Sequence, residues 1–198
     1  IEGLSPAIEE GYRRTIDTFR GLGFPVRTVE LPMLEYVIPA YYTIASAEAS
    51  ANLARYTGIR YGYRNEWAED PRELVETSRD ESLGAEVKMR ILLGTYVLRS
   101  GFQEQYYIKA QKIRSALRGD FEALFETVDL LLMPVFPSQA FAFGDEELDP
   151  FRQKLADKFT ATANLAGLPA LAFPTGLSGS LPVGMQLRHH GVPAALPG

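Results

Sequence analysis

The apolar run VDLLLMPVFP, from Val128 to Pro137, constrains the fold of this chain more than any other stretch. Its near-continuous apolar character and its closing prolines are typical of a strand that is buried on both faces. Directly before it, apolar residues recur at helical spacing from Tyr106 to Val128, which predicts a long amphipathic helix. A helix that leads into a buried strand favours the α/β class, with one domain or part of one.

The first third of the chain repeats this alternation. Ser5-Pro6 is typical of a helix start, and glycine at position 21 can end that helix. Residues 24–32 are short, β-branched and bounded by prolines, so we expect a strand there. From Leu34 to about Tyr56 the alanine and serine content predicts a helix that is closely packed in an interior.

The remaining elements follow in order. Residues 57–71 form a polar, aromatic loop, and helical spacing returns from Leu83 to Leu98. A helix is expected from about residue 149 to 166. Two strands follow it, at 169–176 and 181–188, and the segment LSGS between them is expected to be a tight turn.

Composition excludes several classes of function. The net charge of −5 and the pI of about 5.2 argue against a general nucleic-acid-binding surface. The chain has no cysteine, which removes disulfides and thiol catalysis. It has only two histidines, His189 and His190, so clusters of His and Cys for metal binding are not expected. No apolar run is long enough to predict a transmembrane helix.

Three residues are candidates for binding a small zwitterion. Arg90 lies four residues after Glu86, so it forms either a surface ion pair or a guanidinium fork for a carboxylate. Asp157 faces away from the predicted apolar stripe of its helix, as a solvated carboxylate or as a pocket wall that binds an ammonium group. Tyr41 belongs either to the core or, as the less common alternative, to a pocket.

No catalytic residue emerges from the serines or histidines. Ser178 and Ser180 lack the G-x-S-x-G order and lie between two strands, so we interpret them as turn residues. His189 and His190 are neighbours on an extended segment and point in opposite directions, which makes them a poor metal pair. From these residues alone, Arg90, Asp157 and Tyr41 are candidates for binding a zwitterion, and no residue is a candidate for catalysis.

Three motifs resemble those of a known family: EASANLARYTGIRYG, YYIKAQKIR and TANLAGLPA. With the segments around them, from about Glu2 to Leu187, they resemble the amidase signature family. Within it they are most similar to the glutamine-hydrolysing subunits of tRNA-dependent amidotransferases. The resemblance implies an α/β/α fold with a central mixed sheet covered by helices. Residues 1–198 would be the C-terminal part of one amidase-signature domain, without its N-terminal catalytic part.

The same resemblance implies a function. Proteins of this kind hydrolyse glutamine and supply ammonia to convert Glu-tRNA(Gln) to Gln-tRNA(Gln) in the cytoplasm. The B and C subunits of the amidotransferase would be the partners, and the B component would hold the mischarged tRNA and use ATP and Mg. No cofactor or metal is expected on this chain. The family's Ser–cis-Ser–Lys triad lies in the absent part, so we place no catalytic residue here and expect the chain alone to be inactive.

Residue by residue, the resemblance assigns glutamine recognition to Arg90 for the α-carboxylate, Asp157 for the α-amino group and Tyr41 for the pocket. Two alternatives stay open: a stand-alone amidase of the same family, and an inert fragment that acts only by binding. The chain departs from the family at Ser82, at Val135 and Phe136, and in the tail RHHGVPAALPG over residues 188–198.

Overall fold

A computed structural model describes residues 3–144 and 156–190. The chain divides into two compact units, described separately below. The first, the sheet unit, comprises Ile1–Ile38 and Ile113–Gly198, and the second, the helical unit, comprises Pro39–Lys112. The boundaries fall inside two helices, α2 (Val37–Leu53) and α5 (Lys109–Phe125).

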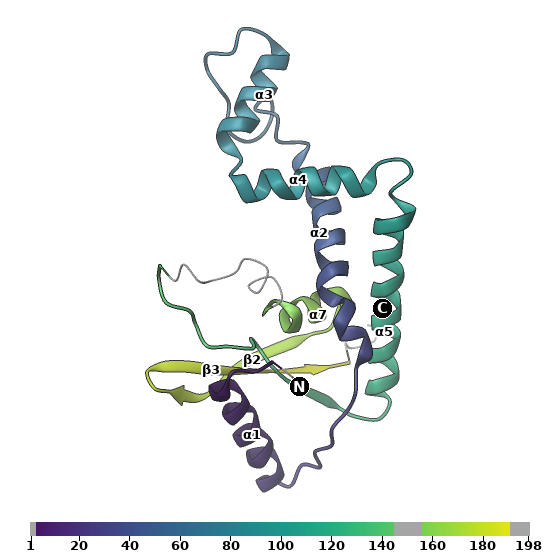
Figure 1. The fold of residues 1–198 in the computed structure, drawn as a ribbon, viewed down its shortest axis with the longest axis vertical. Helices are drawn as coiled ribbons and strands as arrows, with labels where there is room; N and C mark the ends of the chain where they lie inside the picture. Colours follow the sequence, from purple (N-terminus) through teal and green to yellow (C-terminus); the bar gives the residue numbers. More distant parts are fainter. Residues whose placement is uncertain (1–2, 145–155, 191–198) are drawn as a thin grey trace, which may run out of the picture. The chain divides into compact units, whose positions relative to one another are not determined.

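The sheet unit is built on three antiparallel strands in the order β1-β3-β2 (Figure 1). These are β1 (Leu130–Pro134), β2 (Ala170–Ser178) and β3 (Leu181–His189). The hairpin β2-β3 and the apolar strand β1 confirm the predicted strands. Both strand pairs are antiparallel, so these three strands do not contribute the parallel pairing that a mixed sheet requires.

Two helices accompany this sheet in the same unit. Helix α1 (Pro6–Gly21) begins at the predicted start Ser5-Pro6 and buries Ile8 against Val183 and Met185 of the central strand. Helix α7 (Lys158–Ala166) ends at Gly167, whose φ of 70° is the left-handed conformation that glycine adopts without strain. Strand β2 begins three residues later, directly after Pro169, as expected for a proline that has no N–H to donate.

The helical unit contains α3 (Pro71–Ser82), α4 (Ala85–Leu98) and the π-helical turn Glu104–Ile108, besides most of α2 and the start of α5. Helix α4 crosses α2 at Gly94 (Figure 1). A Cβ atom at this position would lie 2.0 Å from the carbonyl oxygen of Ser46, so the two backbones are in direct contact. Only glycine allows this approach.

Two expectations about these elements were wrong. Residues 24–32 form no strand: the chain runs without regular structure to Leu31, and a 3-10 helix follows at Pro32–Tyr36. Most of their side chains are exposed, and no described strand pairs with them. Helix α3 was missed, although Asp70 caps it with bonds from the backbone N–H groups of Arg72 and Glu73 at 2.8 and 2.9 Å.

The helix predicted from about residue 149 lies partly outside the described residues, which exclude 145–155. Its described part begins as α7 at Lys158. None of the helices in residues 3–144 and 156–190 is long and apolar enough to span a membrane.

Candidate functional site

Arg90 lies on α4 with its side chain one-third exposed, at 32%. Its Nε donates to Glu86 Oε1 at 3.0 Å, which confirms the predicted i,i+4 ion pair. The guanidinium carbon also lies 5.3 Å from the ring centroid of Tyr42, at cation–π distance. Among the described residues, none accepts a hydrogen bond from the two terminal nitrogens of Arg90. The side chain is therefore oriented by two neighbours and keeps its fork of donors.

Competing effects act on the pKa of Arg90. Partial burial lowers it, and the hydrogen bond and charge of Glu86, with a smaller contribution from Tyr42 and Tyr41, outweigh burial and raise it. The group is therefore a permanent cation at any pH at which the fold persists. This is the property that recognition of a carboxylate requires.

Tyr41 and Tyr42 stand on α2, and both are half-buried. Their rings meet edge to face, with centroids 5.4 Å apart and planes at 82°. The crossing of α2 and α4 brings these two tyrosines and Arg90 together within the helical unit. Sequence reasoning selected Tyr41 and missed the contact of Tyr42 with Arg90, because no spacing rule relates residues on two crossing helices.

Asp157 belongs to the sheet unit and immediately precedes α7. The residue is half-buried. Its carbonyl oxygen accepts from the backbone N–H of Ala161 at 2.8 Å and from Thr160 Oγ1 at 3.1 Å. Its carboxylate does not cap the helix. The apolar stripe predicted for this helix consists of Phe151, Leu155 and Phe159. The first two lie outside the described residues, and Phe159 is buried as expected.

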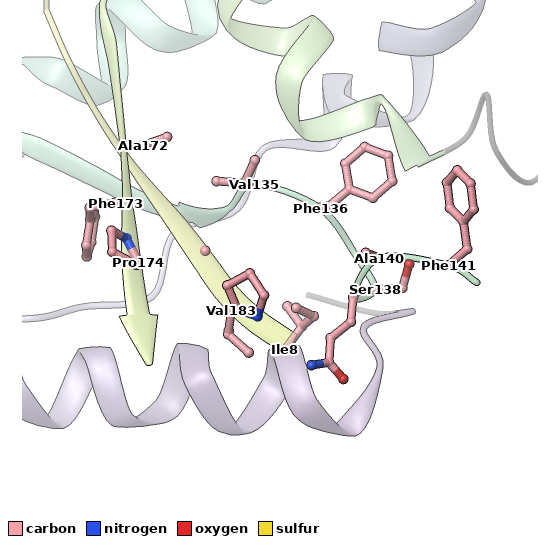
Figure 2. A pocket seen from close by; sticks show the side chains of 13 residues that line it. Ile8, Val135, Phe136, Ser138, Ala140, Phe141, Ala172, Phe173, Pro174 and Val183 are labelled. Carbon is pink, nitrogen blue, oxygen red and sulfur yellow. The ribbon is translucent and has the colours of Figure 1, made fainter. Parts of the chain in front are cut away.

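The sheet unit also contains an open cavity of about 460 Å³ (Figure 2). Ile8, Phe136, Phe141, Phe173, Pro174 and Val183 are among its lining residues, and none of the lining residues is charged. Tyr41, Arg90 and Asp157 do not line it. An apolar cavity suits a hydrocarbon surface and not a free amino acid, so we assign the candidate site to the paired helices α2 and α4.

The residues considered for catalysis have structural roles. Ser180 lies in the hairpin turn, as predicted, whereas Ser178 is the last residue of strand β2 and pairs with Leu181, so its assignment to the turn was wrong. His189 is the last residue of β3 and pairs with Leu130. Among the described residues, no group of three or more His, Asp or Glu side chains could hold a metal ion.

Comparison with known proteins extends this picture. The family model described as Amidase matches residues 1–189. The A subunit of glutamyl-tRNA(Gln) amidotransferase from Methylococcus capsulatus is 48% identical over 186 residues, which are 94% of this chain and 38% of that protein. The protein of the same name from Anaeromyxobacter dehalogenans is 50% identical over 187 residues, 93% of this chain and 38% of that protein.

Solved structures of the same family have a similar fold. The crystal structure of the glutamyl-tRNA(Gln) amidotransferase A subunit from Thermotoga maritima superposes with a TM-score of 0.68 at 32% identity, over 95% of this chain and 36% of that one. A bacterial aryl acylamidase of the amidase signature family superposes with a TM-score of 0.65 at 20% identity, which supports the fold alone. It covers 95% of this chain and 38% of that one.

The fold defines an α/β protein, and its crossing helices α2 and α4 carry a cluster of one arginine and two tyrosines. The chain belongs to the amidase family, which confirms the resemblance seen in its motifs. It spans well under half the length of the relatives described above.

Proposed function

We propose that this chain is the glutamine-recognising part of an amidase-family glutaminase that supplies ammonia for converting Glu-tRNA(Gln) to Gln-tRNA(Gln). Its similarity to A subunits of glutamyl-tRNA(Gln) amidotransferase, at 48–50% identity, supports this function. The observation that carries the proposal is Arg90, because a stand-alone amidase for uncharged amides has no need of an oriented guanidinium fork.

In this proposal, each candidate residue recognises one group of glutamine. The terminal nitrogens of Arg90 bind the α-carboxylate, while Glu86 and Tyr42 hold the guanidinium in place. Asp157 binds the α-amino group, and Tyr41 forms part of the pocket wall. An arginine that binds the α-carboxylate favours a free amino acid over a neutral amide.

The remaining parts of the reaction lie outside this chain. We assign the Ser–cis-Ser–Lys machinery that attacks the amide carbonyl to the part of the relatives that the chain does not span. The B and C subunits of the amidotransferase would receive the ammonia, and the B component would bind tRNA and use ATP and Mg. The complex would act in the cytoplasm.

The test uses a complete enzyme. The matched region of the Methylococcus capsulatus relative is replaced by this chain, and glutaminase kinetics are measured for Arg90→Lys, Arg90→Met and Asp157→Asn. Loss of a charge-assisted hydrogen bond costs about 1.5–3 kcal/mol, so KM for glutamine should rise roughly tenfold to a hundredfold, with a smaller change in kcat. Arg90→Lys keeps the charge but not the bidentate fork, so its KM should lie between those of the parent hybrid and Arg90→Met.

A matched control is Glu76→Gln on α3, where an exposed carboxylate pairs with Arg72 and lies in no candidate site. Its KM should equal that of the parent hybrid. Unchanged glutamine kinetics in both Arg90 variants would contradict the proposal.

The apolar cavity of the sheet unit favours a second candidate, a stand-alone amidase for apolar amides. An aryl amide assayed with the same hybrid separates the two. Turnover of the aryl amide that falls with Phe141→Asp, together with no turnover of glutamine, would favour the second candidate.

A further inference from the structure

Helix α4 carries an apolar stripe that the described structure leaves uncovered. Met89, Leu92, Leu93 and Tyr96 follow the spacing i, i+3, i+4, i+7, which places them on one face of the helix. Their exposed fractions are 60%, 67%, 40% and 41%. Large apolar side chains are often exposed singly, but a continuous row of them is typical of a surface that binds something.

The opposite face of α4 is already packed. Gly94 and Val97 are buried, Gly94 lies against the backbone of Ser46, and the hydroxyls of Thr95 and Ser50 are 3.0 Å apart. A helix that is apolar on both sides is typical of one that is covered on both sides. The residues of α4 therefore suit an interior helix, although the described structure covers one face only.

An aromatic cluster extends the stripe beyond the end of α4. The ring of Tyr96 lies 4.7 Å from that of Phe102 and 6.0 Å from that of Tyr106, measured between centroids. Tyr106 is itself 42% exposed. The apolar surface thus runs from Met89 to the π-helical turn, and aromatic side chains of this kind often anchor interfaces.

We propose that the stripe formed by Met89, Leu92, Leu93 and Tyr96 is the docking surface for the part of an amidase polypeptide that this chain does not span. The relatives match 93–94% of this chain but contribute only 38% of their own length to the match, so a large complementary segment exists in each of them. Family membership supports this occupant over an unrelated protein.

Arg90 lies apart from this stripe. It precedes Gly94 by four residues and Val97 by seven, which places it on the face of α4 that packs on α2. The docking surface therefore does not depend on the role proposed for Arg90 in glutamine recognition.

The absence of cysteine makes a direct test possible, because one introduced thiol is unique. The Leu92→Cys variant is mixed with the unmatched part of the Methylococcus capsulatus relative, and its rate of labelling by a maleimide is measured. The rate should fall on the order of tenfold or more as the segment is added. Glu76→Cys, on the exposed side of α3, is the matched control and should label at an unchanged rate.

A second measurement titrates binding of the same segment by calorimetry. Leu92→Asp should weaken it roughly thirtyfold or more, while Glu76→Gln should leave it unchanged, with circular dichroism confirming equal helix content. Absence of binding, equal protection at both thiols, or binding that ignores Leu92→Asp would each overturn the proposal.

Protection of the Leu92→Cys thiol in the isolated chain, together with sedimentation as a dimer, would show that a second copy occupies the stripe and would also overturn the proposal. Glutamine kinetics test the proposed function and not the docking surface. Normal KM values in Arg90 variants refute the proposed function and leave the docking result intact.

Discussion

Replacement of Gly94 by alanine tests whether backbone contact between α2 and α4 holds the candidate site together. The added Cβ would lie 2.0 Å from Ser46 O and 2.6 Å from Ser50 Cβ, far inside ordinary contact distance. Neither atom belongs to a long flexible side chain, so the helices would have to move apart by roughly 1 Å or more. We expect loss of stability and displacement of Arg90 from Tyr42.

The magnitude follows from two opposing effects. Overpacking of a well-packed contact costs about 1–3 kcal/mol, and alanine offsets up to about 1 kcal/mol through its better helix propensity. Gly119 on α5 supplies the matched control, because a Cβ there meets no atom within 4 Å. Gly119→Ala should therefore be stabilising by about 0.5–1 kcal/mol, the opposite sign for the same substitution.

The assay is thermal and urea unfolding of the two variants beside the parent chain. At about 2–4 °C per kcal/mol for a chain of this size, the two midpoints should differ by several degrees, with Gly94→Ala the lower. In the hybrid enzyme, Gly94→Ala should also raise KM for glutamine. Equal midpoints, or a Gly94→Ala variant as stable as Gly119→Ala, would refute the view that α2 and α4 meet through their backbones.

Further predictions concern a helix cap and a buried cation. Asp70→Ala removes the N-cap of α3 and should cost about 1 kcal/mol in thermal unfolding, whereas Asp70→Asn should cost much less. Arg188 is fully buried, bonds only Phe159 O and Gln186 Oε1, and has one unpaired nitrogen and no carboxylate partner in the described part of the chain. Arg188→Met should therefore raise the free energy of unfolding at pH 7 by about 1 kcal/mol or more, and a less stable variant would contradict this. Burial lowers the pKa of Arg188 to about 10, so above about pH 10 the unfolded chain binds more protons than the folded chain. The stability of the parent chain relative to Arg188→Met should be constant below about pH 10 and rise above it, as measured by unfolding midpoints against pH.

Local patterns in the sequence predicted much of the fold. The helices α4 and α5 follow from apolar spacing, α1 follows from its Ser5-Pro6 start, and the hairpin β2-β3 follows from two apolar runs around LSGS. Gly167 was expected to end its helix, and it does so in the left-handed conformation. These features depend on neighbours a few residues away, so the sequence contains the information directly.

The errors concern features that local patterns do not determine. Residues 24–32 have the composition of a strand, but a strand needs a paired neighbour, and the described sheet offers them none. Helix α3 was overlooked although Asp70-Pro71 followed by Glu73 is a helix-start pattern. The helix-start signal was present, but it follows directly after a polar, aromatic segment whose composition predicts a loop.

The contacts of the candidate site also divide into those that local sequence patterns predict and those that they do not. By itself, the spacing of Glu86 and Arg90 predicted an i,i+4 ion pair, with a carboxylate-binding fork as the alternative. Only the tertiary structure decided that Arg90 stacks on Tyr42, that Asp157 is half-buried, and that one apolar face of α4 stays uncovered. The physical reason is distance along the chain: contacts between crossing helices depend on how close two backbones approach, and at α2 and α4 that distance was set by a glycine.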